Sequence, residues 1–136
     1  MNREELKKLL PHREPMLLVD EAERLEDGRA VGKYTVRGDE FFLQGHFPGN
    51  PVVPGVILCE IMAQTCGVLF SAETEDKTPY YTGLDKVRFR RKVLPGDTIH
   101  IECAITKQKG PFCFASGKCT VNGELALSAD FSFALM

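Results

Sequence analysis

The chain has 136 residues, of which 43% are hydrophobic and 26% are charged, and its formal net charge is −2. This is enough chain for one globular domain with one core, so residues 1–136 are expected to form a single domain. The charge argues against general affinity for nucleic acids or membranes, no apolar run approaches the ~20 residues of a membrane helix, and no signal peptide is visible at the N-terminus.

The first part of the chain predicts a short helix, two strands and a long loop. Glu4 to Leu10 favours a short helix that the following proline stops. The apolar segment 16–19 is expected to begin a strand and Ala30–Val36 to form another, with a turn at Asp27-Gly28 between them. The region from Gly38 to Pro54 is rich in glycine and proline and is expected to be a loop.

A helix is predicted from Gly55 to about Ala72. Its apolar side chains point in nearly every direction around the helix axis: Val56, Ile57, Leu58, Ile61, Met62, Val68, Leu69 and Phe70. A helix that is apolar all round is a buried helix. A sheet can cover one side of it, and in so small a chain we expect a second copy of the same chain to cover the other.

The chain after Pro79 is predicted to be all strand. Apolar residues alternate with polar ones along two stretches: Ile99, Ile101, Cys103 and Ile105, and then Leu125, Leu127, Ala129, Phe131, Phe133 and Leu135. Asn122-Gly123 predicts a type I′ hairpin, and the segments 95–97 and 109–111 predict further turns. Four antiparallel strands therefore follow the helix, and the two earlier strands would complete an α+β fold with a sheet of about six strands.

The five cysteines, at positions 59, 66, 103, 113 and 119, form no CxxC pair and no Cys/His metal-binding spacing. Cys59 and Cys66 would lie roughly 10 Å apart on a helix, which is too far for a disulfide. We therefore expect buried thiols, no metal and a reducing compartment, the cytoplasm. A nucleophilic Cys59 is the alternative, although no histidine neighbours it in the sequence.

The segment from His46 to Gln64 combines the parts of a proton-transfer site. His46 lies in a loop stiffened by prolines, and Glu60 interrupts an almost wholly apolar segment in which an unpaired charge would be costly. Gln64 lies one helical turn after Glu60 and can hydrogen-bond it. The alternative is that Glu60 points to solvent. The other histidines, His12 and His100, are expected to be ordinary exposed side chains.

The dipeptide Pro54-Gly55 is expected to open the helix. Proline suits the first helical turn, so simple capping is one interpretation. Gly55, however, lacks a Cβ where a ligand could approach, and the N–H groups of Gly55 and Val56 would be free at the positive end of the helix dipole. These groups are candidates for an oxyanion site.

The run His-Phe-Pro-Gly-Asn-Pro-Val-Val-Pro-Gly-Val at 46–56, followed by Glu60 and by Ala-Gln at 63–64, resembles a known active-site motif. The motif is that of the (3R)-hydroxyacyl-[acyl-carrier-protein] dehydratases of type II fatty acid synthesis. Residues 10–20 resemble the N-terminal segment of that family, and residues 86–97 resemble its post-helix strand and turn. The resemblance implies a hot-dog fold, in which an antiparallel sheet wraps around one long central helix.

The resemblance also implies an activity, the dehydration of a (3R)-hydroxyacyl-[acyl-carrier-protein] to the trans-2-enoyl form. No cofactor is implied, because the substrate is carried on the phosphopantetheine of acyl carrier protein. His46 would be the base and Glu60 the acid, with the Gly55 and Val56 N–H groups as the oxyanion site and Gln64 in support. The implied assembly is a homodimer in which His46 and Glu60 of one site come from different subunits, commonly as a hexamer (a trimer of dimers).

Two further groups of residues are candidates for substrate contacts. Candidates for lining or gating an acyl tunnel are three aromatic residues, Phe47, Tyr80 and Tyr81, although the tyrosines could equally belong to the core. Candidates for docking the acidic carrier protein are three basic residues, Arg88, Arg90 and Arg91, for which an ordinary solvated strand face is the alternative.

Three other functions stay open from the sequence. Relatives that also isomerise the double bond usually have Asp at the position of Glu60, so a bifunctional dehydratase/isomerase is one alternative. A hot-dog acyl thioesterase usually carries a differently placed acid and lacks the His-Phe-Pro-Gly element. A non-catalytic acyl-binding module should have lost His46 or Glu60.

Overall fold

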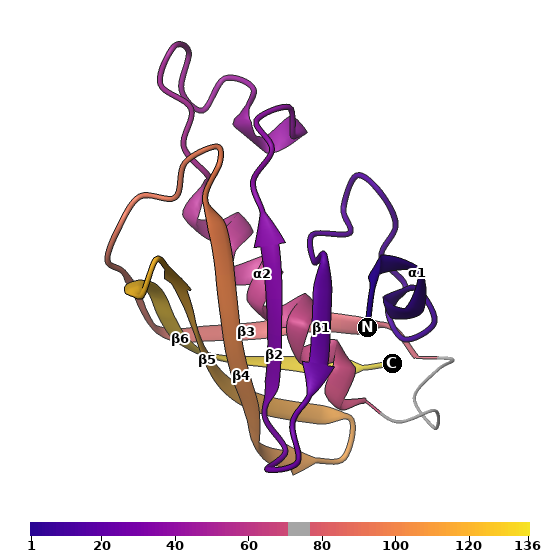
Figure 1. Ribbon diagram of the computed structural model, residues 1–136. Coiled ribbons are helices and arrows are strands. Elements are labelled where there is room, and N and C mark those ends of the chain that lie inside the picture. The colour runs from indigo at the N-terminus through magenta and orange to yellow at the C-terminus, as the bar shows by residue number, and fades with distance from the viewer. Residues whose placement is uncertain (71–76) are drawn as a thin grey trace.

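In the computed structural model, which describes residues 1–70 and 77–136, a curved antiparallel sheet wraps around the central helix α2 (Gly55–Cys66) (Figure 1). The sheet has six strands in the order β1-β2-β4-β5-β6-β3. The strands are β1 (Glu21–Arg24), β2 (Ala30–Thr35), β3 (Pro79–Phe89), β4 (Thr98–Lys109), β5 (Phe112–Val121) and β6 (Glu124–Leu135). This architecture confirms the predicted α+β class and the hot-dog fold.

The N-terminal segment differs from the prediction. Helix α1 (Arg3–Leu6) forms but is shorter than expected, and the strand predicted at 16–19 is wrong, because β1 begins only at Glu21. Residues 17–19 are buried, yet they pair with no strand of the sheet. Instead, the side-chain amide of Gln64 accepts from the Leu18 N–H at 2.8 Å and donates to the Met16 carbonyl at 2.7 Å. A helix side chain thus replaces the neighbouring strand.

The central helix is also shorter than predicted. Its α-helical part ends at Cys66 and continues as a 3-10 turn, η2 (Gly67–Leu69), after which the backbone is extended at Phe70. Residue 72, where the predicted helix ended, lies outside the described residues. A Cβ on Gly67 would collide with the side chain of Leu10, so the end of the helix packs directly against the N-terminal segment.

The inner face of the sheet lies close to α2, which contacts β2, β4, β5 and β6. Two glycines on the strands permit this approach. A Cβ on Gly32 would lie 2.9 Å from the Thr65 side chain, and a Cβ on Gly117 would lie 2.9 Å from the Met62 sulfur. The buried surface of the helix therefore fits the sheet without space for a further side chain at these points.

The strands after Pro79 confirm the predicted two-residue period. The inward-facing residues Ile99, Ile101 and Cys103 of β4 are buried and Ile105 is half-buried, and Asn122 and Gly123 both have positive φ, 50° and 80°, as a type I′ turn requires. The alternation of burial fails twice in β6: Ala134 is buried between Phe133 and Leu135, and near the start of the strand Ala126 is buried while Leu125 is exposed. The pairing of β5 with β6 shifts register there, and such an irregularity moves the next side chain to the other face.

Part of the apolar surface is left uncovered by this chain. Val56, on the outer side of α2, is 70% exposed, and β3 is an edge strand whose apolar residues Tyr80, Leu84 and Phe89 are also exposed. The sheet of this chain therefore covers only one side of the apolar helix α2. Edge strands with exposed apolar side chains are sites at which another chain can pair. A second copy as the cover stays a prediction.

All five cysteines are free and buried, as expected. Burial raises the pKa of the Cys59 thiol and raises the pKa of the Cys119 thiol to about 12, so both are protonated near neutral pH. Burial and a raised pKa give no support to the alternative of a nucleophilic Cys59. Within residues 1–70 and 77–136, the helices are all too short or too polar to cross a membrane.

Candidate active site

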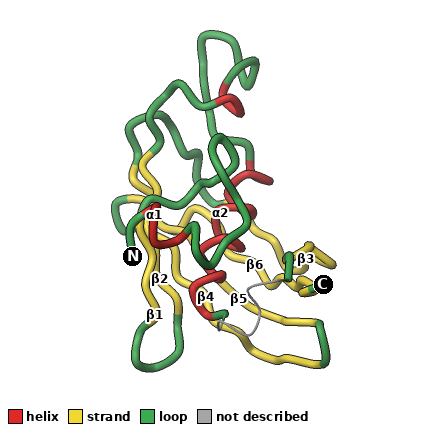
Figure 2. Tube along the Cα trace, turned by 90° about the vertical axis from the view of Figure 1, so that its right-hand side faces the viewer, coloured by secondary structure: helices red, strands yellow, loops and turns green. Residues whose placement is uncertain are grey.

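The loop that carries His46 projects beyond the end of the sheet (Figures 1 and 2). The buried carboxylate of Glu40 anchors its beginning. It accepts hydrogen bonds from the Tyr34 hydroxyl at 2.7 Å and from the backbone N–H groups of Arg37 at 3.0 Å and Gly38 at 2.7 Å. Burial opposes the charged form, but these bonds outweigh it and hold the pKa of the Glu40 carboxyl below its ordinary value. The loop thus starts from a fixed point on β2.

The imidazole of His46 is held in one orientation. Its Nδ1 lies 3.0 Å from the carbonyl oxygen of Val52, and its ring stacks on Phe47 with 4.2 Å between the ring centroids. A carbonyl oxygen can only accept, so this contact requires the proton on Nδ1. The neutral ring then has a free lone pair on Nε2, which is the state that a general base needs.

His46 shares a cavity of about 660 Å³ with the start of α2, including Gly55 and Val56. Among the described residues, no acceptor pairs with the N–H of Gly55 or of Val56, and the first helical bonds run from Ile57 and Leu58 to the Pro54 carbonyl. The absent Cβ of Gly55 has a reason that the sequence did not show. A Cβ there would lie 2.7 Å from the ring of Phe89, so that ring, and not a ligand, occupies the space.

Glu60 lines a different and smaller cavity of about 190 Å³, together with His12, Gln64, Tyr80 and Tyr81. Its Oε2 accepts from Gln64 Nε2 at 2.8 Å and lies 3.3 Å from His12 Nε2. The side chain is only 24% exposed. Glu60 is thus a paired carboxylate inside a pocket, and the alternative of a side chain that simply points to solvent is wrong.

The position of His12 corrects a further prediction. His12 is not an ordinary exposed loop histidine, because its side chain is 21% exposed and contacts Glu60. The two residues are far apart in the sequence, so no local spacing could reveal the contact. The only signal was that His12 belongs to the N-terminal segment that carries part of the family resemblance. His100, by contrast, is exposed as expected.

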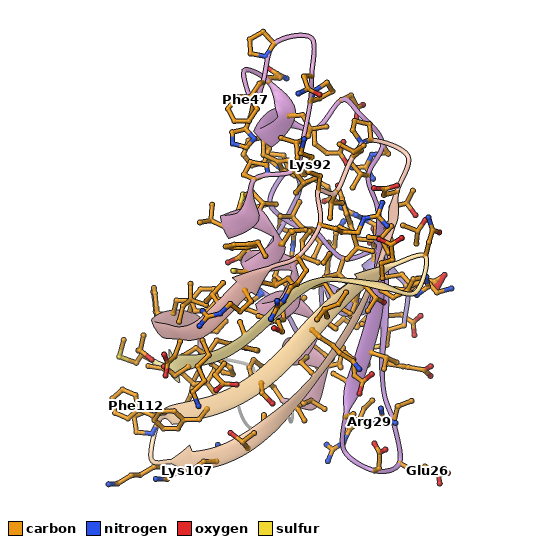
Figure 3. All side chains as sticks on the ribbon, turned by 90° about the vertical axis from the view of Figure 1, so that its left-hand side faces the viewer. Glu26, Arg29, Phe47, Lys92, Lys107 and Phe112 are labelled. Carbon is orange, nitrogen blue, oxygen red and sulfur yellow. The ribbon has the colours of Figure 1, made fainter. Side chains whose placement is uncertain are left out.

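The three aromatic candidates separate into two places. Tyr80 and Tyr81 line the cavity of Glu60, whereas Phe47 lies at the tip of the projecting loop (Figure 3). The Tyr81 hydroxyl donates to the Cys59 carbonyl of α2, and burial raises the pKa of this tyrosine. Tyr81 is therefore fixed to the helix, while Tyr80 is the more exposed of the two.

The basic residues after β3 lie at the cavity of His46. Arg90, Arg91 and Lys92 line it, and Lys92 lies at the same end of the molecule as Phe47 (Figure 3). Arg91 is occupied by its own chain: it donates to the Val121 carbonyl at 3.1 Å and lies 3.6 Å from the Glu124 carboxylate. Arg90 is exposed at the cavity and Arg88 is exposed on the adjoining strand.

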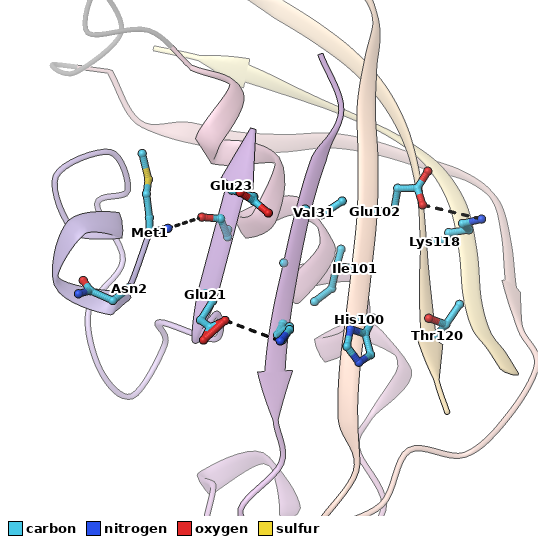
Figure 4. A pocket seen from close by; sticks show the side chains of 13 residues that line it. Met1, Asn2, Glu21, Glu23, Val31, His100, Ile101, Glu102, Lys118 and Thr120 are labelled. Atoms are coloured by element: carbon cyan, nitrogen blue, oxygen red, sulfur yellow. Dashed lines mark hydrogen bonds and ion pairs between the residues drawn. The ribbon is translucent and has the colours of Figure 1, made fainter. Parts of the chain in front are cut away.

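A third cavity, of about 550 Å³, lies on the outer face of the sheet (Figure 4). It is lined by residues of β1, β2, β4 and β5, among them His100 and Glu102. Its charges largely pair with one another, as in the contacts of Lys118 with Glu102 at 4.0 Å and of Lys33 with Glu21 at 3.9 Å. None of the predicted site residues lines this cavity.

The fold places the chain among the hot-dog proteins. It resembles the solved dehydratase heterocomplex ApeI:P from Xenorhabdus doucetiae, with a TM-score of 0.82 and 21% identity over 96% of this chain and 90% of that one. It also resembles a hypothetical thioesterase with coenzyme A from Streptococcus pneumoniae, with a TM-score of 0.63 and 16% identity over 85% and 84% of the two chains. At these identities the likeness shows the fold alone.

The sequence identifies the family. Residues 10–130 match the FabA-like domain. The curated 3-hydroxyacyl-[acyl-carrier-protein] dehydratase FabZ of Clostridium perfringens is 44% identical over 137 residues, which cover 99% of each chain. That of Staphylococcus epidermidis is 46% identical over 134 residues, which cover 96% of this chain and 92% of the relative. The chain therefore belongs to the FabA-like family, and the resemblance drawn from the motif is confirmed.

Proposed function

We propose that this chain is a hydro-lyase that dehydrates (3R)-hydroxyacyl-[acyl-carrier-protein] to the trans-2-enoyl form in fatty acid biosynthesis. The observation that carries the proposal is its near-full-length identity to curated FabZ dehydratases. The free cysteines suit a reducing cytoplasm. The reaction moves only protons and one hydroxide, so the side chains can perform it without a cofactor.

In the proposed mechanism, Nε2 of neutral His46 removes a proton from the α carbon of the thioester. The electron pair of the broken C–H bond delocalises onto the thioester oxygen, which becomes negatively charged. Because the α proton is only weakly acidic, this charge needs stabilisation. The free N–H groups of Gly55 and Val56 are the proposed donors to that oxygen. Donors of this kind typically contribute about 3 kcal/mol to stabilising the transition state.

Glu60 is the proposed acid. It gives a proton to the hydroxyl that leaves the β carbon, so the products are the enoyl thioester and one water molecule. The cycle ends with a protonated His46 and an ionised Glu60, and it resets when the proton passes from the imidazole to the carboxylate. Gln64 supports this role by holding one carboxylate oxygen at 2.8 Å.

In a homodimer with two shared sites, the proposed base and the proposed acid would act on the same substrate. Within one chain, His46 and Glu60 line different cavities. The exposed side chain of Val56 and the apolar edge strand β3 offer the surface on which a second copy would sit. We propose that His46 of one copy lies next to Glu60 of the other across this surface. We also propose that three such dimers assemble into a hexamer, as the resemblance implies.

The proposed activity is tested by incubating the protein with (3R)-hydroxyacyl carriers of several chain lengths and identifying the products by mass spectrometry. We expect the trans-2-enoyl carrier, which is lighter by one water molecule. A double bond moved to the next position would show additional isomerase activity. Release of the free acid without any enoyl product would refute dehydration and identify a thioesterase.

The proposed docking of the carrier protein gives a second prediction. Reversing Arg88 and Arg90 to Glu should raise KM for carrier-bound substrates about tenfold, with much less effect on a short pantetheine substrate, because charges at the rim act mainly on encounter. The wild-type preference for the carrier should weaken at high salt.

The matched control reverses two lysines at the far end of β4, Lys107 and Lys109, of which Lys107 is labelled in Figure 3. This variant carries the same change of net charge and should leave both KM values unaltered. An equal loss on carrier-bound and short substrates in the arginine variant would indicate damage to the fold, and an equal effect of the two double variants would exclude a local docking surface.

A further inference from the structure

The carboxylate of Glu60 is held asymmetrically. Both of its nitrogen contacts, Gln64 Nε2 at 2.8 Å and His12 Nε2 at 3.3 Å, are made by the same oxygen, Oε2. In the part of the chain that the structure describes, Oε1 has neither a hydrogen bond nor an ion pair. The two oxygens of the proposed acid are therefore in different environments.

The orientation of the Gln64 amide is fixed by its other contacts. Its oxygen accepts from the Leu18 N–H, so its nitrogen is the end that faces Glu60 and donates to Oε2. Because Oε2 already receives this bond, a proton on the carboxyl is better accommodated on Oε1. The same N-terminal segment that holds Gln64 also carries His12.

The surroundings of His12 indicate its protonation. Its Nδ1 is buried and has no hydrogen-bond partner among the described residues. An imidazolium would leave a charged N–H unpaired there, which is costlier than leaving a bare ring nitrogen unpaired. The neutral tautomer with its proton on Nε2 avoids this, and Nε2 lies 3.3 Å from Oε2 of Glu60, within reach of a hydrogen bond to it.

We propose that His12 is a positioning residue for Glu60: with Gln64 it holds Oε2 as a double acceptor and leaves Oε1 to carry the proton to the departing hydroxyl. This inference rests on the proposed role of Glu60 as the acid. It adds a second supporting side chain, after Gln64, to the pair His46 and Glu60. His12 acts through Glu60 and does not itself touch the reacting atoms.

The test compares three substitutions of His12 on a short pantetheine substrate. In His12→Gln the side-chain amide nitrogen is the same number of bonds from the backbone as Nε2 of histidine. In His12→Asn the amide nitrogen is one bond closer, at the distance of Nδ1. The side chain in His12→Leu has no hydrogen-bond donor. We expect Leu and Asn to lower kcat about tenfold to a hundredfold with KM changed less than about twofold, and Gln to restore kcat to within about threefold.

Substituting His12 in a variant that already lacks the acid distinguishes positioning of Glu60 from a general loss of structure. In Glu60→Gln, adding His12→Leu should lower kcat by less than about twofold more, because the residue acts only through the acid. His100→Leu, on the outer face of the sheet (Figure 4), is the matched control and should keep wild-type kcat. Melting temperatures show which variants are folded. If His12→Leu unfolds, the comparison of Asn with Gln decides the question.

The possible failures are distinguishable. If Glu60→Gln is inactive but His12→Leu and His12→Asn keep kcat within about twofold, the inference about His12 is wrong and the proposed function stands. If Glu60→Gln itself keeps full kcat, the assignment of the acid is wrong. Equal losses in all three His12 variants, Gln included, would show that packing of the imidazole matters and that its hydrogen bond does not.

Discussion

His46→Ala and Glu60→Gln should each lower kcat by at least ~10² while the chain stays folded. Neither side chain belongs to the buried core, and Gln at position 60 can still accept the hydrogen bond from Gln64. Steady-state kinetics on a short substrate, with circular dichroism to verify folding, measures the effect. Since both residues serve one reaction, the double variant should lose much less than the product of the two single losses.

Mixing the two inactive variants extends this prediction to the shared site. After subunit exchange, each mixed dimer should contain one site with both residues intact and one site with neither. A random mixture is about half mixed dimer, so activity should return to roughly a quarter of wild type, as follows from two-fold symmetry. Each variant mixed with itself should stay inactive. No recovery despite proven exchange would place His46 and Glu60 in the same subunit.

A charge on the edge strand should abolish both assembly and activity. Leu84 of β3 is 46% exposed, and Leu84→Lys would place an ammonium group on the surface proposed to bind the second copy. Light scattering should show the wild type as a dimer or larger assembly. The dissociation constant of the dimer should be about tenfold or more higher in the variant, which is then more monomeric at the same concentration. Activity should fall in parallel, because the monomer holds only half-sites.

The control for this variant is Phe112→Lys at the start of β5, where the original side chain is 45% exposed and strand β6 separates it from the edge strand β3. It introduces the same group at nearly the same exposure and should leave assembly and activity unaltered. A folded, fully active monomer of either the wild type or Leu84→Lys would refute the shared site.

The parts of the fold that sequence predicted correctly are those fixed by local chemistry. The two-residue period of β4 and β6, and the Asn122-Gly123 turn, depend on neighbouring residues only. The segment 16–19 has the apolar sequence of a strand because residues 17–19 are buried, but its backbone partner is the distant side chain of Gln64. The early end of α2 likewise depends on a tertiary contact, that of Gly67 with Leu10.

In the candidate site, too, the contacts between residues near in sequence were predictable and those between distant residues were not. Glu60 and Gln64 are one helical turn apart, so sequence spacing was enough to predict their contact. His12 reaches Glu60 only through the folded path of the N-terminal segment, and no spacing in the sequence encodes that. Arg91 was grouped with its neighbours as a docking residue, but its bond to the carbonyl of Val121 appears only once β3 and β5 are in place.

The packing of Phe89 on Gly55 constrains how sequences of this fold can diverge. The ring would lie 2.7 Å from a Cβ at position 55, so a larger residue there requires the exposed ring of Phe89 to move or to be replaced by a smaller side chain. Packing therefore favours a glycine at position 55, whereas the N–H groups of Gly55 and Val56 are free because the first N–H groups of a helix have no acceptor within it.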